Sequence, residues 1–197
     1  MLEPEKRIKT KKQLKEWLDY ELPKYGNNKL VNMLAITEIA IVRKHQYLLR
    51  KTEYCINTNK RILGAFYKIR LFKLQNKHAL HIPPNCCAKG LRIMHLGPIL
   101  MNSGVVIGEN CAIHMNTSFV AGGTTNSAPR LGNGVVVGVG AVILGGVTIA
   151  DNVAIGANAV VNKDVLEENI AVAGVPAKKV SDNGRKEWNK KAKQEDK

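Results

Sequence analysis

Several features that mark particular protein classes are scarce or absent in this chain of 197 residues. Aromatic residues make up only 5% of it, and no apolar run approaches the ~20 residues that cross a bilayer. The N-terminus is charged and no apolar stretch follows it, so we expect no secretory signal and residence in the cytoplasm. The four cysteines form no C-x2-C pair, which favours free thiols over disulfides or a zinc site.

Acidic residues are also in deficit, and the deficit lies mainly in one part of the chain. Lys and Arg number 30 against 16 Asp and Glu, a formal charge of +14. Residues 1–81 hold 18 basic and 7 acidic residues, whereas residues 82–180 hold 6 and 5. The basic part is either a solvated face or a surface for anions such as an acidic membrane or a phosphorylated substrate. It lacks interleaved aromatic residues and nucleic-acid motifs, so we expect no nucleic-acid partner.

The clearest positive feature is a six-residue repeat between Leu131 and Leu166. A large aliphatic residue recurs at every sixth position, and a second aliphatic residue follows it four positions later. Six residues turn an α-helix by about 600°, so these positions would not share a helical face. Short strands joined by corners on the faces of a prism fit the spacing, and this pattern is typical of a parallel β-helix. The first positions are Leu131, Val137, Ile143, Ile149, Ile155 and Val161, and the fifth are Val135, Ala141, Val147, Val153, Ala159 and Val165.

The sequence predicts three regions: a basic helical region at 1–81, a β-helix at 82–180 and a basic C-terminal tail at 181–197. Apolar residues at three- and four-residue spacing place helices at 12–20, 30–49 and 62–74, with a turn at Gly26–Asn28. Counting back from Leu131 in sixes gives further apolar residues, so the register of the β-helix continues toward the N-terminus. These residues are Phe119, Ile113, Ile107 and Met101.

The six-residue pattern is interrupted in two places. Ile99 and Ile107 are eight residues apart, so two additional residues are expected to bulge out between them. Residues 121–130 are rich in Gly, Thr, Asn, Ser and Pro, and they predict an excursion from the coil. At the C-terminal end, residues 171–180 predict one edge strand with a turn.

Several local motifs carry a resemblance to a known family: IPPN (82–85), GLRIMH (90–95), the GG pair (122–123), GVGAVILGGVTI (138–149), IGANAVVNKDV (155–165) and AGVPAK (173–178). On these motifs the chain resembles the hexapeptide-repeat acyltransferases. Within them it is most similar to serine O-acetyltransferases, particularly the shorter variants linked to capsule and exopolysaccharide synthesis. The resemblance implies a left-handed β-helix, acetyl-CoA as cosubstrate, and a homotrimer with active sites between neighbouring coils.

Transfer of an acyl group to a hydroxyl needs a base for the hydroxyl proton, and a neutral imidazole suits that role near pH 7. His95 stands where the family has its essential histidine, so the resemblance makes it the candidate base. His114 follows the inward-facing Ile113 one coil later and could approach His95 across adjacent coils. The backbone N–H groups of Gly122 and Gly123 are candidate donors to the developing oxyanion.

Coenzyme A is long, thin and anionic, so it needs a narrow groove with small side chains and basic residues near its phosphates. Gly140, Ala141 and Ala157 are candidates for the wall of that groove, although tight corners of a β-helix require small residues as well. By resemblance, Asn162 and Lys163 match the cofactor-binding turn of the family, and Lys178 matches a basic residue after GVP. We expect no metal requirement.

At positions that would contact the acceptor, the chain departs from serine acetyltransferases in its charged residues. Those enzymes have Asp before the essential His, where this chain has Met94, and Arg-His before the Pro of the long loop, where it has Ser127 and Ala128. A sugar hydroxyl needs no partners for an ammonium and a carboxylate, so the departures favour a sugar or polysaccharide acceptor. The alternative is a genuine serine O-acetyltransferase of cysteine biosynthesis.

Two other classes share the fold or the charge pattern. A metal-dependent hydratase of the γ-carbonic anhydrase type needs three His ligands, and only His95 and His114 fall within the predicted β-helix. A non-catalytic binding scaffold would use the basic helical region without any chemistry at the histidines.

Overall fold

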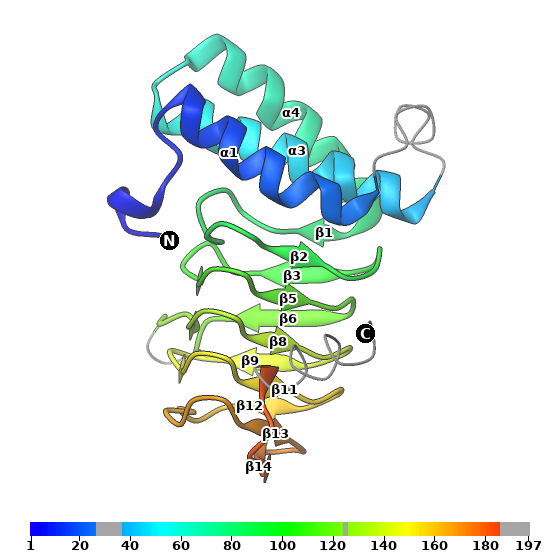
Figure 1. The fold of residues 1–197 in the computed structure, drawn as a ribbon, viewed down its shortest axis with the longest axis vertical. Helices are drawn as coiled ribbons and strands as arrows, with labels where there is room; N and C mark the ends of the chain where they lie inside the picture. The colour runs from blue at the N-terminus through cyan, green and yellow to red at the C-terminus, as the bar shows by residue number, and fades with distance from the viewer. Residues whose placement is uncertain (27–36, 124–125, 186–197) are drawn as a thin grey trace, which may run out of the picture.

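The computed structural model describes residues 1–26, 37–123 and 126–185. The helices lie together at one end of the molecule, which we call the helical end. They cap a stack of triangular coils that continues to β14 at the opposite end of the molecule (Figure 1). The coils form the left-handed parallel β-helix that the six-residue repeat and the family resemblance predicted. None of the described helices is long and apolar enough to cross a membrane.

The helical end consists of the short 3-10 helices η1 (Pro4–Lys6) and η2 (Leu22–Tyr25) and the α-helices α1 (Lys11–Glu21), α3 (Glu38–Asn57) and α4 (Arg61–His78). Thr10 caps α1 by a capping box with Gln13, which satisfies N–H groups that the first helical turn leaves unpaired. The three predicted helices are therefore present, with α3 and α4 ending later than expected. Residues 30–36 of the second predicted helix, and Asn27–Asn28 of the predicted turn, lie outside the described residues.

In the described part of the chain, fourteen short strands form the β-helix, and they lie in three sheets. Sheet A has the order β1-β3-β6-β9-β12, sheet B β10-β7-β4, and sheet C β14-β13-β11-β8-β5-β2. From β3 to β12, successive strands therefore visit sheets A, B and C in turn. Their bounds are β1 Leu80–His81, β2 Arg92–Ile93, β3 Ile99–Met101, β4 Val106–Ile107, β5 Ala112–Ile113, β6 Thr117–Val120, β7 Arg130–Leu131, β8 Val136–Val137, β9 Val142–Leu144, β10 Thr148–Ile149, β11 Ala154–Ile155, β12 Val160–Val161, β13 Ala171–Ala173 and β14 Lys178–Ser181.

The core of the prism is built from the repeated aliphatic positions. Phe119, Ile113 and Ile107 are fully buried and Met101 nearly so, which confirms the register that was counted back from Leu131. The two additional residues, however, lie elsewhere than predicted. Ile93 pairs with Ile113 and Met101 with Phe119, so eight residues replace six between β2 and β3, before Ile99 rather than after it.

Two features at the ends of the β-helix differ from the expectation, and the predicted excursion is present. Strand β1 starts at Leu80, because this residue already pairs with Ile99 in sheet A, so the β-helix begins two residues earlier than residue 82. Residues 171–180 contain strand β13 and the start of β14, which pair antiparallel as a hairpin, rather than one edge strand. The expected excursion is present between β6 and β7, of which residues 124–125 lie outside the description.

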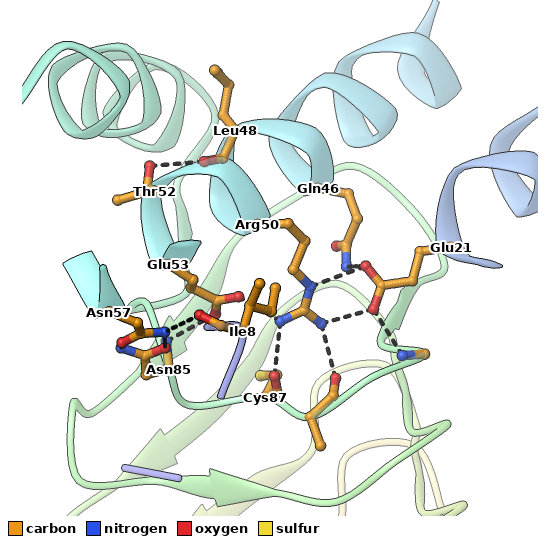
Figure 2. Close-up of polar contacts among 12 residues, drawn as sticks. Ile8, Glu21, Gln46, Leu48, Arg50, Thr52, Glu53, Asn57, Asn85 and Cys87 are labelled. Carbon is orange, nitrogen blue, oxygen red and sulfur yellow. Dashed lines mark hydrogen bonds and ion pairs between the residues drawn. The ribbon is translucent and has the colours of Figure 1, made fainter. Parts of the chain in front are cut away.

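A buried polar network joins the helical end to the first coil (Figure 2). The Arg50 guanidinium donates to Glu21 and Glu53 at 2.8 Å each and to the carbonyls of Cys87 and Ala88, also at 2.8 Å. Its side chain is fully buried, so these acceptors replace the water that a guanidinium would otherwise bind.

The cysteines are free and buried, as their spacing predicted. They are Cys55, Cys86, Cys87 and Cys111, and three of them lie in the main core around the first coils.

Candidate active site

Both histidines of the predicted site lie at the corner where the chain passes from sheet C to sheet A; we call this the C–A corner. His95 follows β2 and His114 follows β5, one coil further along. Their ring centroids are 5.9 Å apart with an interplanar angle of 37°. In the register of sheet C, Met94 aligns with His114, and His95 is the residue after Met94. His95 lies in the enlarged corner between β2 and β3 and is close to His114 from there. The structure thus brings the two predicted residues together.

A carboxylate from the helical end, that of Glu38, contacts one of these two histidines. Glu38 Oε1 lies 3.1 Å from His95 Nδ1 and also accepts a hydrogen bond of 2.8 Å from the backbone N–H of Leu96. Thr37 caps α3 by accepting from the backbone N–H of Ala40, so Glu38 occupies the first turn of that helix, where a carboxylate is favourable. With the ring proton on Nδ1, His95 donates to Glu38 and keeps Nε2 as a hydrogen-bond acceptor.

Sequence reasoning missed Glu38, because 57 residues separate it from His95. The only local signal was a capping Thr followed by Glu at the start of a helix, and that pattern is common at helix N-termini. Glu38 and His95 are both about half exposed, at 47% and 57% of their side chains, so a substrate can reach them.

His114 is the less accessible member of the pair. Burial lowers its pKa below the ordinary value of histidine, and the neighbouring His95 lowers it further. Its Nδ1 is buried with no hydrogen-bond partner among the described residues. The lowered pKa favours the neutral form of His114, so this residue places no positive charge beside the exposed His95.

Small residues continue the C–A corner below His114. Gly138 and Gly156 follow it in register through the next two coils. A Cβ at Gly138 would lie 2.8 Å from the Ala157 backbone nitrogen, and one at Gly140 would lie 2.1 Å from Asn158 Oδ1. Coil stacking therefore requires these two glycines, and their small size alone is not evidence of a cofactor groove. The glycines do, however, keep the part of the C–A corner next to His114 free of bulky side chains.

The remaining predicted cofactor residues at this corner divide into two kinds. Gly140 is half-buried and Ala157 is exposed, so both contribute surface near the histidines. Ala141 is fully buried in the prism core, and its N–H donates to the Gly138 carbonyl at 3.2 Å. Its side chain points inward because it occupies the fifth position of the repeat, so it does not line a surface groove.

The other predicted residues lie mainly at a second corner, where the chain passes from sheet A to sheet B; we call this the A–B corner. Gly122 and Gly123 follow β6, and Asn162 and Lys163 follow β12. The Gly122 N–H donates to the Ser127 carbonyl at 3.0 Å, so the loop itself uses one of the two candidate oxyanion donors. Lys178 begins β14, at the end of the prism. Within one chain these residues are not gathered around His95.

A hollow of about 490 Å³ lies at the A–B corner. Lys163 and Asn162 line it on one side and Ser127 on the other, with Gly145 and Gly146 between them. Arg130, the nearest basic residue to the loop in sequence, is exposed on β7 in sheet B and does not share the C–A corner with the histidines. Among the described residues no group of three or more His, Cys, Asp and Glu is arranged to hold a metal ion.

Comparison with known proteins agrees with the repeat and the fold. The family model for "Bacterial transferase hexapeptide (six repeats)" matches residues 128–163. A serine acetyltransferase from Buchnera aphidicola is 31% identical over 145 residues, which cover 71% of this chain and 51% of that protein. The chain thus spans about half the length of this relative.

Solved structures share the fold over most of the chain. A serine acetyltransferase from Brucella abortus in complex with coenzyme A superposes with a TM-score of 0.66 at 20% identity, covering 89% of this chain and 70% of that one. The Neisseria gonorrhoeae enzyme in complex with serine gives a TM-score of 0.61 at 23% identity, covering 85% and 69%. The fold and the family match therefore define a hexapeptide-repeat β-helix. Within that class, the chain is similar in sequence and in fold to serine acetyltransferases.

Proposed function

We propose that this protein is an acetyl-CoA-dependent O-acetyltransferase whose base is His95. The observation that carries the proposal is the arrangement of Glu38, His95 and His114 at one corner of a hexapeptide-repeat prism. The likeness to serine acetyltransferases, one of them solved with coenzyme A, supports the choice of cosubstrate.

In the proposed reaction, His95 Nε2 accepts the proton of the acceptor hydroxyl while the hydroxyl oxygen attacks the thioester carbonyl carbon. Glu38 accepts the Nδ1–H bond, which fixes the ring and stabilises the imidazolium that forms. The C–S bond then breaks, and the departing thiolate takes the proton from His95. The neutral, half-buried His114 adds no second charge that would compete with this imidazolium.

Acetyl-CoA is held, on this proposal, between two copies of the chain in a homotrimer. The exposed surface of Gly140 and Ala157 lies at the C–A corner, whereas Asn162 and Lys163 lie at the A–B corner. Packing the A–B corner of one copy against the C–A corner of the next would bring both sets to one cosubstrate. Lys163 and Lys178 would then meet its phosphates, and Gly123 would remain as the candidate oxyanion donor.

Serine is the acceptor that the comparisons support better than a sugar. The sequence argued against serine partly because Met94 replaces the Asp that precedes the essential His in serine acetyltransferases. Glu38 of α3 supplies a carboxylate beside His95 in its stead. A carboxylate at this place can orient the base or pair with the ammonium of an amino acid. The sugar acceptor remains a second candidate, because Ser127 and Ala128 offer no cation for the serine carboxylate.

The test is an acceptor panel with the purified full chain. Acetyl-CoA is incubated with serine or with sugars and oligosaccharides, and loss of thioester absorbance reports transfer. We expect turnover with serine to exceed turnover with every sugar by at least about tenfold. Faster turnover with a sugar would reject serine, and no acceptor-dependent turnover would reject the acetyltransferase itself.

A further inference from the structure

Helix α4 is apolar on two opposite faces, and the described residues cover one of them. On the inner face Leu71 and Gly64 are buried, and a Cβ added at Gly64 would lie 3.4 Å from Cys55 Cβ. On the opposite face Ile62, Phe66 and Ile69, spaced four and three residues apart, are exposed to 91%, 50% and 57%. We call this second face the outer face of α4; its members are Ile62, Leu63, Phe66, Ile69 and Phe72.

The cations of α4 surround this outer face. The helix contains no acidic residue and carries Arg61, Lys68, Arg70, Lys73 and Lys77. The Arg70 guanidinium lies 5.3 Å from the Phe66 ring centroid, and the Lys68 ammonium lies 5.5 Å from that of Phe72. The charges thus border the aromatic rings directly, so the outer face of α4 presents apolar and cationic groups side by side.

A hollow of about 340 Å³ opens between α3 and α4 beside this face. Its apolar lining comes from Ile41, Leu48 and Leu74. Its cations are Lys44 of α3 and Arg70, Lys73 and Lys77 of α4. A hollow with an apolar lining and four cations suits a phosphate headgroup together with the first part of an acyl chain.

We propose that the outer face of α4, with the hollow beside it, docks on the surface of an anionic phospholipid bilayer. The helices lie at the end of the molecule opposite β14, where α4 faces away from the β-helix (Figure 1). A bilayer of anionic lipids offers both an apolar layer and negative charge, which match the two kinds of side chain present. A second copy of α4 would bring further cations and no acidic residue, so charge complementarity favours the membrane.

The test uses the full chain and sedimentation with vesicles of phosphatidylglycerol and phosphatidylcholine, compared with phosphatidylcholine alone. We expect retention on the anionic vesicles that falls as salt rises. The double variant Phe66→Ser/Ile69→Ser and the triple variant Arg70→Gln/Lys73→Gln/Lys77→Gln should each weaken retention at least about tenfold. The matched control, Leu166→Ser/Val180→Ser, changes exposed aliphatic residues at the opposite end and should leave retention unchanged.

Two results would overturn the proposal. One is equal retention of the wild-type chain and the two α4 variants on anionic vesicles. The other is a change of oligomeric state in Phe66→Ser/Ile69→Ser, measured by light scattering, with lipid retention unchanged, which would assign the face to a second copy. All altered side chains are exposed or half-buried, and circular dichroism of each variant checks that the fold is retained. The proposal does not rest on the acetyltransferase function, and the vesicle assay contains no acetyl-CoA.

Discussion

The helical end and the β-helix of this protein are held together by different kinds of contact. Most of the buried polar side chains in the described residues belong to the helical end, among them Arg50, Glu53 and His45. The β-helix core is almost entirely aliphatic, and each coil repeats the contacts of the one before it. Neighbouring coils therefore pack on one another through similar apolar contacts. The polar network, by contrast, holds the helices in a single orientation on the first coil.

This difference matters for the site, because the site draws on both regions. The repeat brings His95 and His114 to one corner, but only the docked helical end brings Glu38 to His95. Loosening the helical end should therefore impair catalysis while the coils remain formed. The predictions below separate the two regions, beginning with the largest expected effect.

Replacing Arg50 by Met should detach the helical end. The change leaves Glu21 and Glu53 buried without their cation, which costs about 3–5 kcal/mol of unfolding free energy. Urea unfolding, monitored by the fluorescence of Trp17, measures this loss, since the Trp17 ring centroid lies 4.8 Å from the Arg50 guanidinium. All proteins compared carry Trp188→Phe, so that the signal comes from Trp17. The exposed Arg130→Met is the control and should stay within about 0.5 kcal/mol of wild type. A loss below about 1 kcal/mol for Arg50→Met would show that the network does not hold the helices.

Replacing His95 by Ala should lower turnover at least ~100-fold, the low end of the contribution of a general base. The β-helix should remain intact, because His95 is exposed and outside the core. Steady-state rates with saturating acetyl-CoA measure the effect, with His81→Ala, an exposed histidine of β1, as the control. Near-wild-type turnover of His95→Ala would remove this residue from the proposed role.

Acid should weaken the helical end before the coils, through His45. Burial, with a further contribution from Arg50, lowers the pKa of His45 to about 3, and its Nε2 lies 3.2 Å from Gln75 Nε2. The unfolded chain binds a proton at this histidine below about pH 6 while the folded chain does not, so stability falls as pH falls. Between about pH 6 and pH 4.5 we expect a loss of about 2 kcal/mol from this group.

The check on His45 is urea unfolding at both pH values in wild type and in His45→Gln. The variant keeps a hydrogen-bonding side chain and cannot titrate, so its stability should depend less steeply on pH. Equal pH dependence in the two proteins would assign the acid sensitivity to other groups.

The smallest expected effect is that of Glu38→Gln, which removes one charge-assisted hydrogen bond to His95. We expect kcat to fall about tenfold, the equivalent of about 1.4 kcal/mol, with KM for acetyl-CoA unchanged. Glu38→Asp should recover part of kcat, and Glu5→Gln, which changes an exposed carboxylate of η1, should have none of these effects. An unchanged kcat with a raised KM for serine would instead show that Glu38 binds the ammonium of the acceptor.

The comparison of the two regions also explains which features could be predicted from the sequence. The positions that face the core, such as Phe119 and Ile113, follow from the six-residue spacing because each coil closes over the previous one in fixed register. The sequence prediction placed the two additional residues after Ile99, because Ile93 and Ile99 are six residues apart. Counting back from Leu131 gives Met101 instead, and the pairing of Met101 with Phe119 shows that this second count is the correct one.

The candidate site was predictable where its residues share the repeat and unpredictable where they do not. His95 and His114 follow equivalent strands, so their meeting at one corner follows from coil stacking. Ala141 looked like a groove residue from its small size, but the same repeat places its side chain inside the prism. Gly122 and Lys163 belong to another corner, and bringing them to the histidines requires a second copy of the chain on our proposal.

The sequence by itself determined the β-helix, its register and the pairing of two histidines, because these depend on a local period that every coil obeys. Only the folded chain shows that Glu38 reaches His95, that Arg50 joins the helices to the first coil, and that the described residues leave the outer face of α4 exposed. Each of these depends on how the helical end docks on the coils. That orientation is set by contacts between residues tens of positions apart, which no periodic pattern in the chain encodes.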